Sequence, residues 1–323
     1  MKRWDMLAIA AFMTGMLIPM AGQPRPREWQ VNDMLISDSG TVRSLGLTVE
    51  DMEALTYGVD EIPGYECRPN PYNGNHTIIG LNGNGDKPTG WLRSHISRGW
   101  TNLATGDLLR VDVRVYDKPA GEYERHENYR WGSQVLPKLG SFSGLPVGEE
   151  CFHYGKTRLW FREGRVVAEV TLLLRREAEL ADGLFVEALA WGIEYRIRLH
   201  PKRLLGMAQK PVTLLVANKP FGQGKVISLA GVTVAPLSTL EPAQVALETE
   251  RTKMEWVVTA RRGEKWVRVR AFSWEMETDK GKVKLERPVF PYKGELIVPL
   301  RQVAEALGIS VQQKGQTVAL LPK

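Results

Sequence analysis

The clearest alternation of hydrophobic and polar positions runs through residues 109–116, where valines stand at every second position from 111 to 115. This period of two predicts a strand with one buried face. A second unit, residues 158–174, has two apolar runs on either side of an acidic-Gly dipeptide at 163–164. Because such a dipeptide favours a two-residue turn, this unit predicts a β-hairpin.

Residues 177–196 carry apolar side chains at spacings of three and four, which predicts an amphipathic helix. This apolar stripe consists of Leu180, Leu184, Ala188, Trp191 and Tyr195. A shorter helix is predicted from Thr48, which stands three residues before Asp51 in the spacing of a capping box. Together these elements predict an α+β domain with an antiparallel sheet and a long helix.

Between residues 58 and 100 the chain is dense in Gly, Asn and Pro, so this stretch is predicted to consist mainly of loops. From residue 225 onward the pattern is β-rich with one clear short helix. We therefore divide the chain into a signal peptide at 1–22, an α+β domain of unknown function at 23–215, and a β-rich domain at 216–323. The last of these is expected to fold independently.

The first residues combine positive charge with an apolar run. Lys2 and Arg3 precede the apolar residues 6–20, and the small residues Ala21 and Gly22 follow. This layout is typical of a signal peptide, and the run is shorter than the roughly 20 residues that span a bilayer. We expect export, either to the cell envelope or as a secreted protein, with a retained membrane anchor as the alternative. No later apolar stretch is long enough to span a membrane.

The charge of the chain limits its expected partners. The formal net charge is +6, and removing residues 1–22 removes Lys2, Arg3 and Asp5, a net of +1, which leaves +5. A mildly basic exported protein suits contact with an anionic cell-wall polymer or with another envelope protein. The charge is too diffuse to indicate a nucleic-acid partner.

The chain has two cysteines, Cys67 and Cys151. In an oxidising compartment they could form one disulfide. The bridge would close a loop of about 84 residues, and such a bridge contributes on the order of 4 kcal/mol. Two separate buried thiols are the alternative, because the sequence does not show whether the two backbones approach closely enough.

The most informative stretch begins at residue 293. A strand is predicted to end at Val298, and Pro299 takes the first helical position, where its missing N–H costs nothing. Gly308 is expected to end the helix. The helix has one apolar face, which must pack on the sheet made by the flanking strands. This face consists of Leu300, Val303, Ala304 and Leu307.

Two motifs in this stretch carry a resemblance to a known family: Val298-Pro299-Leu300-Arg301 and Ala304-Glu305-Ala306-Leu307-Gly308. They resemble the copper amine oxidase N-terminal-like domain, the stalk domain common in exported proteins of Gram-positive and related bacteria. The resemblance is specific over residues 280–323 and weak over 225–280. It implies a β-rich extracellular spacer or interaction module without catalytic activity, appended to a different effector domain.

A faint internal repeat runs through the same part of the chain. The segment 235–237 (Ala-Pro-Leu) resembles the segment 298–300 (Val-Pro-Leu), 63 residues later. The first copy lacks both the Arg of the motif and the Gly that would end the helix, so the sequence does not predict a helix there with the same force.

The family name suggests copper, but the residues do not. The chain has neither a His-x-His ligand pair nor the Asn-Tyr-Asp/Glu sequence from which a quinone cofactor could form. We therefore assign no copper, no other cofactor and no amine oxidation.

Reactive residue types gather most densely at Glu149, Glu150, Cys151 and His153. A Cys near a His could act as a nucleophile with its base, whereas the simpler interpretation is the start of a strand with a buried or bridged Cys. The loop 82–86 has oxygen-bearing side chains at alternate positions but fails the calcium-loop pattern. The histidines show no zinc-ligand spacing. We assign no catalytic residue and no metal.

Basic residues gather at two places. Trp266, Arg268 and Arg270 alternate with valines and are predicted to share one face of a strand, which could bind an anionic wall polymer. A solvated strand face is the alternative. Arg196 and Arg198 end the long helix, where cations stabilise the helix dipole.

Three classes of function remain open. The first, which we favour, is a non-enzymatic envelope protein in which a stalk-like module displays the α+β domain. The second is an exported enzyme, such as a hydrolase, with its site between residues 58 and 100 or at 149–153. The third is an exported ligand-sensing domain. A concave site lined by polar groups would favour the second class.

Overall fold

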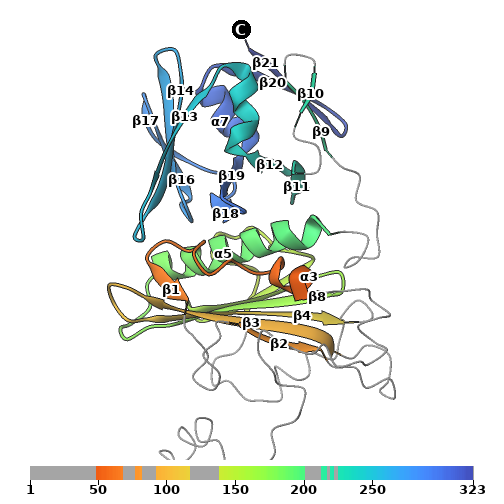
Figure 1. The fold of residues 1–323 in the computed structure, drawn as a ribbon, viewed down its shortest axis with the longest axis vertical. Helices are drawn as coiled ribbons and strands as arrows, with labels where there is room; N and C mark the ends of the chain where they lie inside the picture. The colour runs from red at the N-terminus through yellow and green to blue at the C-terminus, as the bar shows by residue number, and fades with distance from the viewer. Residues whose placement is uncertain are drawn as a thin grey trace, which may run out of the picture.

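The computed structural model describes residues 49–67, 77–81, 92–116, 138–200, 212–216, 219–221 and 225–322. A large antiparallel sheet carries one long helix, α5 (Leu180–Arg198), and a β-rich module covers the other side of that helix (Figure 1). The helix therefore lies between two β structures. This arrangement confirms the predicted α+β class, with a larger domain followed by a β-rich module that has a short helix.

The large sheet has the strand order β1-β3-β4-β8-β7-β6-β5, with β2 also paired to β3. Its strands are β1 (Tyr65–Cys67), β2 (Thr77–Leu81), β3 (Leu92–Asn102), β4 (Leu108–Tyr116), β5 (Lys138–Leu139), β6 (Glu150–Tyr154), β7 (Arg158–Glu163) and β8 (Val166–Leu173). The valines at 111, 113 and 115 of β4 are fully buried, as their alternation predicted. β7 and β8 form the predicted hairpin, with its turn at 164–165, one position later than expected.

The first part of the larger domain is more regular than its composition indicates. Within the stretch 58–100, which was predicted to be mainly loop, the described residues include β1, β2 and most of β3, whereas residues 68–76 and 82–91 lie outside the described part of the chain. β3 pairs with β4 along nearly its whole length and contains only one Gly and one Asn, Gly99 and Asn102. The predicted short helix is α3 (Val49–Glu53), and Met52 and Leu55 are fully buried. Its predicted cap, Thr48, lies outside the described residues.

Helix α5 is buried on nearly all sides, without interruption from Val186 to Ile197. Of the predicted apolar stripe, Trp191 and Tyr195 are buried, whereas Leu180 is 58% exposed. The prediction of a one-sided amphipathic helix was therefore wrong. The helix touches β7 and β8 of the large sheet and also β11 and β18 of the module, so it forms part of both cores.

The module consists of three small sheets, a 3-10 helix η1 (Leu237–Ala243) and a short helix α7 (Leu300–Ala306). The sheets have the orders β10-β9-β21-β20, β11-β12-β19-β18 and β13-β14-β15-β16-β17. Their strands are β9 (Thr213–Val216), β10 (Lys219–Phe221), β11 (Ile227–Leu229), β12 (Val232–Pro236), β13 (Ala246–Arg251), β14 (Trp256–Arg262), β15 (Lys265–Arg270), β16 (Glu275–Thr278), β17 (Gly281–Lys284), β18 (Phe290–Tyr292), β19 (Glu295–Pro299), β20 (Ile309–Lys314) and β21 (Thr317–Pro322). Because β9 pairs with β21, the module takes in residues on both sides of the predicted boundary at 215. The independent folding of 216–323 stays a prediction.

The faint sequence repeat corresponds to a structural repeat. β12 of the first copy pairs with β19 of the second, and Ala235 lies opposite Val298. Each copy begins with a hairpin, β11/β12 or β18/β19. Both hairpins turn through two successive residues with positive φ, at 230–231 in the first copy and 293–294 in the second. The two copies therefore build the central sheet of the module together.

After these hairpins the two copies diverge. The second continues into α7, which follows Pro299 at its N-cap and is succeeded by Gly308 with a φ of +73°. The predicted strand, helix and stop are thus present, with Pro299 one position earlier than expected. The first copy continues into η1, where Gln244 takes a φ of +63°. Gln244 thus takes the left-handed conformation that Gly308 has in the second copy, and the helix before it is a 3-10 helix.

Candidate functional site

The predicted reactive cluster lies on β6 and shows no activated nucleophile. Cys151 is buried, and burial raises the pKa of its thiol to about 12, whereas a catalytic cysteine needs a lowered pKa. The ring of His153 packs against Phe142, with ring centroids 4.6 Å apart. The glutamates at 149–150 pair with Arg162 on the neighbouring strand. These contacts favour the interpretation as a strand start with a buried Cys.

Cys67 and Cys151 are two separate buried thiols in the structure, not a disulfide. They lie on β1 and β6, and β3, β4, β8 and β7 stand between those strands in the sheet. At about 4.8 Å per strand, the two cysteines are ~24 Å apart across the sheet. A disulfide requires Cα atoms within about 7 Å of each other. Of the two alternatives that the sequence leaves, the structure has the second.

Trp266, Arg268 and Arg270 share one face of β15, since the valines between them are buried. Both arginines face carboxylates. Arg268 lies 3.5 Å from Glu250, and Arg270 lies 2.9 Å from Glu255. The predicted basic face is therefore a surface of mixed charge, and polymer binding there stays a prediction.

The family-motif residues of the module are structural in character. The apolar members are fully buried in its core: Val298, Leu300, Ala304 and Leu307. Arg301 and Glu305 lie on the outer side of α7, with guanidinium and carboxylate 4.0 Å apart, a surface pair that adds little stability. The motif thus builds the helix-on-sheet core rather than a reactive site.

The joint between the larger domain and the module centres on Arg196 of α5, which is only 1% exposed. Its guanidinium donates to the carbonyl oxygens of Thr56, at 3.1 Å, and Pro291, at 3.0 Å. It also lies 2.6 Å from the Glu61 carboxylate. Thr56 and Glu61 belong to the larger domain, whereas Pro291 lies in β18 of the module. One buried cation therefore ties together three segments that are far apart in the sequence.

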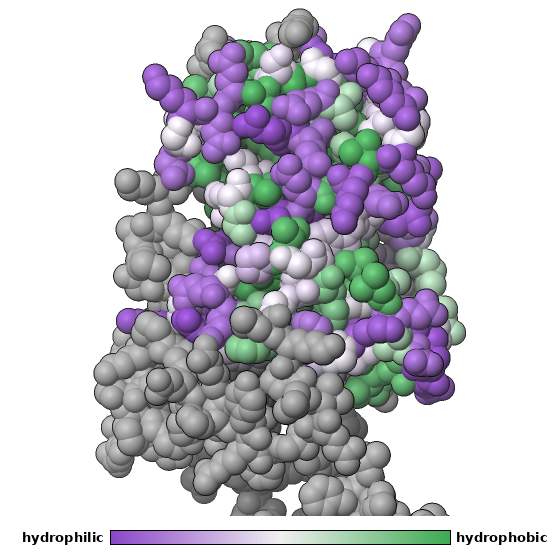
Figure 2. Space-filling view, turned by 180° about the vertical axis from the view of Figure 1, so that it is seen from behind, coloured by the Kyte–Doolittle hydropathy of each residue, from purple (hydrophilic) through white to green (hydrophobic). Residues whose placement is uncertain are grey.

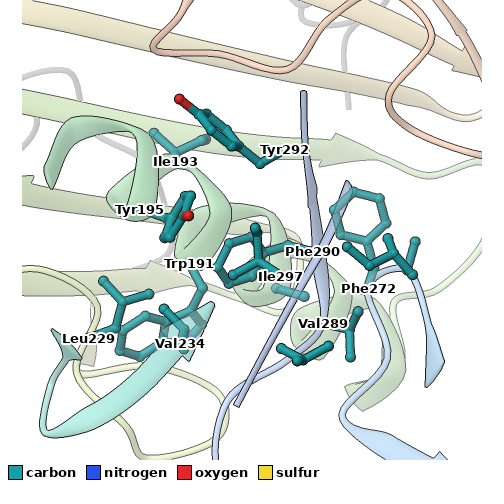
Figure 3. Packing of buried hydrophobic residues seen from close by; sticks show 14 of the residues in the cluster. Trp191, Ile193, Tyr195, Leu229, Val234, Phe272, Val289, Phe290, Tyr292 and Ile297 are labelled. Carbon is teal, nitrogen blue, oxygen red and sulfur yellow. The ribbon is translucent and has the colours of Figure 1, made fainter. Parts of the chain in front are cut away.

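Aromatic rings surround this cation. The guanidinium of Arg196 lies 4.2 Å from the centre of the Tyr57 ring and 5.2 Å from that of Tyr292. Tyr195 packs against Phe290 and Tyr292, with ring centroids 5.4 and 5.1 Å apart (Figure 3). Such contacts add to the apolar burial of the rings. The larger domain and the module share one continuous hydrophobic core at this joint.

A second buried arginine reaches α5 from the module. The guanidinium of Arg287 lies 4.5 Å from the centre of the Trp191 ring and donates to the Ala230 carbonyl oxygen at 2.8 Å. Its Nε finds no acceptor within the part of the chain that the structure describes. Burial lowers the pKa of this guanidinium. Arg287 is thus a less well satisfied counterpart of Arg196.

Three carboxylates are buried where α5 meets the rest of the larger domain. Glu187 and Glu194 accept hydrogen bonds from backbone N–H groups of the loop 141–148, at 2.8 Å each. Glu163 lies 3.0 Å from Arg198. Burial raises the pKa of all three carboxyls, that of Glu163 to about 7. Their partners are protein groups, so they hold the loop and the β7/β8 hairpin on the helix.

Sequence reasoning placed Arg196 only as a helix-ending cation. Its role depends on Glu61 and Pro291, which stand 135 and 95 positions away. The one available signal was the basic residue near the end of a helix rich in apolar residues. The local sequence pattern does not predict the contacts of Arg196 with Glu61 and Pro291.

Among the described residues, no three His, Cys, Asp or Glu side chains lie together as metal ligands. The predicted signal peptide at 1–22, the loop 82–86, His76 and His126 lie outside those residues. No helix in the described part of the chain is both long and apolar enough to cross a membrane.

The comparisons with known proteins bear on the module. No curated protein and no solved structure matches the chain. The family model described as the copper amine oxidase N-terminal domain matches residues 228–321. This match runs from β11 to β21 and so spans both copies of the repeat, including the copy whose resemblance was weak. The module of residues 228–321 is therefore a member of the copper amine oxidase N-terminal domain family, a non-catalytic module of the stalk type.

Proposed function

We propose that the protein is an exported, non-enzymatic protein of the cell envelope, in which the stalk-type module is a rigid mount for the α+β domain. The module's family supports the non-catalytic role. The charged and apolar layout of residues 1–22 supports export.

The observation that carries the proposal is the Arg196 joint. A spacer on a flexible linker would leave few buried contacts between the two parts. Here a buried cation bonds to Glu61 of one part and Pro291 of the other. Because breaking a buried ion pair leaves an uncompensated charge, hinge motion at this joint is costly. The α+β domain is thus held in a fixed orientation on the module.

A distance measurement tests this rigidity. Spin labels on Leu173→Cys and Val283→Cys would report one distance across the joint, since both positions are exposed and lie in different parts. The native cysteines are buried and should stay unlabelled. We expect one narrow distance distribution, which Arg196→Met broadens. A broad distribution in the otherwise unchanged chain would contradict the rigid mount.

Export is tested separately. Expressed in a Gram-positive host, the protein should be recovered outside the cytoplasm with its N-terminus near Gly22 or Gln23. Mass spectrometry of the purified protein measures that terminus. Recovery of a chain with intact Met1 in the membrane fraction would contradict cleavage and favour the anchor.

A further inference from the structure

The β5–β6 loop, residues 140–149, is held on α5 by acidic side chains of that helix. Glu187 accepts a hydrogen bond from the backbone N–H of Ser143, and Glu194 accepts one from the backbone N–H of Gly148, at 2.8 Å each. Hydrogen bonds to charged acceptors are the stronger ones. A change in the charge balance around these carboxylates therefore changes how firmly the loop is held.

Glu194 shares one guanidinium, that of Arg198, with Glu163 at the end of β7. Arg198 lies 2.7 Å from the Glu194 carboxylate and 3.0 Å from the Glu163 carboxylate. Both oxygens of Glu194 are bonded, one to Arg198 and the other to Gly148. By contrast, Oε2 of Glu163 is buried and finds no partner within the described part of the chain. Because an unsatisfied buried oxygen is costly, more so when it is charged, this site favours a protonated Glu163.

The surroundings of these two carboxylates differ from those of surface charges. Figure 2 shows a mostly hydrophilic surface over the module, where charged side chains meet water. Glu163 and Glu194 are instead only 3% and 1% exposed. Water therefore screens little of the repulsion between them when both are ionised.

Other charged groups around Glu163 do not remove this repulsion. The groups that face it are the guanidiniums of Arg162 and Arg198 and the carboxylates of Glu149 and Glu194. Arg162 is already paired with the glutamates at 149–150. Arg287 of the module favours the ionised form of Glu194, but its guanidinium bonds to backbone carbonyl oxygens. An ionised Glu163 thus adds a second negative charge to a guanidinium that already neutralises Glu194.

We propose that Glu163 is a pH-dependent latch for the β5–β6 loop, closed while Glu163 carries a proton and released when it loses that proton. In the closed state Arg198 serves Glu194 alone, and Glu194 holds Gly148. In the released state the two carboxylates compete for Arg198, and the loop opens more often. This inference goes beyond the proposed function and uses none of the Arg196 contacts.

The direction of the pH dependence follows from the burial of Glu163. Burial raises the pKa of its carboxyl to about 7 from the ordinary 4.5, whereas in the open loop the carboxyl meets water. The closed loop therefore binds the proton more tightly than the open loop does. The closed state is favoured most below about pH 4.5 and loses this advantage as the pH rises through about 7.

The loop also packs against Cys151, which gives its opening a chemical readout. This thiol is 3% exposed, and the backbone N–H of Val147 in the loop interacts with its sulfur. The backbone N–H of Gly140, at the other end of the loop, donates to the Cys151 carbonyl oxygen at 2.8 Å. A thiol reagent that needs an accessible sulfur therefore reports the open population.

Hydrogen exchange of the full chain, followed by mass spectrometry and divided by the intrinsic exchange rate at each pH, tests the latch. Protection of peptides from the loop should fall about 30-fold between about pH 5.5 and about pH 8. Glu163→Gln cannot lose a proton, so its loop should keep the same protection over this range. Glu248→Gln removes an exposed carboxylate on β13 and is the matched control, which should behave like the unchanged chain.

Urea separates opening of the loop from unfolding of the whole chain. Local opening exposes little surface, so low concentrations of urea should leave exchange in the loop unchanged and should speed exchange in β4, which requires global unfolding. Labelling of Cys151 at one fixed pH near 8 should be at least about tenfold faster in the unchanged chain than in Glu163→Gln. At a single pH the ionisation of the thiol does not affect this comparison.

The proposal is overturned if protection of the loop in the unchanged chain does not depend on pH, or if Glu163→Gln shows the same dependence. It is also overturned if the loop exchanges only through global unfolding. Because the first result needs no variant, the test holds even where Glu163→Gln folds poorly. The spin-label distance across the joint involves none of these residues, so failure here leaves the rigid mount untouched.

Discussion

On the side of the larger domain, α5 is held by carboxylates that accept hydrogen bonds from a loop, through Glu187 and Glu194. On the side of the module, it is held by contacts between guanidinium groups and aromatic rings: Arg196 of the helix lies over Tyr292 of the module, and Arg287 of the module lies over Trp191 of the helix. The carboxylates fix a loop only 44 to 46 positions away, whereas Arg196 joins residues 95 to 140 positions away. The first set of contacts completes a domain. The second couples two domains.

Of the substitutions that distinguish the two sides of α5, the removal of Arg196 should lower the free energy of unfolding most. Arg196→Met removes the cation beside the largely buried Glu61 carboxylate, which keeps the hydrogen bonds from the backbone N–H groups of Gly58 and Lys293, and it removes the donor to the Pro291 carbonyl oxygen. Breaking a buried pair from one side costs about 3–5 kcal/mol of the free energy of unfolding. Urea denaturation of the full chain measures it. Arg268→Met, which disturbs only a surface pair, is the control and should change stability by less than about 0.5 kcal/mol. Equal effects of the two variants would contradict the joint.

The carboxylate side should show itself in the pH dependence of stability. Burial raises the pKa of Glu163 in the folded chain to about 7 from its ordinary 4.5, so the folded protein binds this proton more tightly. The contribution of this carboxyl to the free energy of unfolding should therefore be largest below about pH 4.5. It should fall by on the order of 3 kcal/mol as the pH rises to about 7. Glu187 and Glu194 contribute in the same direction.

Glu163→Gln isolates this contribution. Urea denaturation at a series of pH values should give a shallower fall between pH 4.5 and 7 for the variant than for the unchanged chain. Parallel curves for the two proteins would show that Glu163 keeps an ordinary pKa in the folded state.

Two glycines of α5 allow the two sides to be compared within one helix. A Cβ at Gly192 would lie 1.9 Å from the Tyr57 hydroxyl of the larger domain and 3.3 Å from Phe290 Cβ of the module, so Gly192→Ala displaces Tyr57 and disturbs the packing at the joint. Overpacking of this kind costs about 1–3 kcal/mol. A Cβ at Gly183 would meet the Phe142 ring at 2.7 Å, on the loop side. Gly183→Ala should broaden no spin-label distance across the joint, whereas Gly192→Ala should broaden it.

Arg287 sharpens the comparison because it is the less satisfied arginine of the module. Its buried Nε lacks an acceptor among the described residues, so the charge is costly to bury. Arg287→Met should therefore change the free energy of unfolding by no more than about 1 kcal/mol, in either direction. A loss as large as that of Arg196→Met would show that both arginines carry the coupling.

We expect no disulfide between Cys67 and Cys151. Thiol labelling of the denatured, unreduced chain should find two reactive thiols, Cys67 and Cys151. The native chain should react slowly, because burial raises the pKa of these thiols to about 11 and about 12. Detection of a disulfide would require the sheet to have a different strand order.

Local features were predictable from the sequence. The valines of β4, the proline before α7 and Gly308 after it act through neighbouring positions, so pattern and turn chemistry identify them. The joint was not predictable in this way. Arg196 needs Thr56, Glu61 and Pro291, which only the folded chain brings together.

One error has a clear physical origin. Helix α5 was predicted to have a solvent face, and the module covers it. A tertiary contact that no local pattern encodes decided the burial of this helix.

The central claim is that the larger domain and the module form one cooperative unit through α5. Scanning calorimetry of the full chain tests it most directly. We expect a single transition whose calorimetric enthalpy equals the van't Hoff enthalpy. Arg196→Met should lower the temperature of this transition or split it into two transitions. Two separate transitions in the unchanged chain, with the module's transition indifferent to Arg196→Met, would contradict the claim and leave the module a spacer that folds on its own.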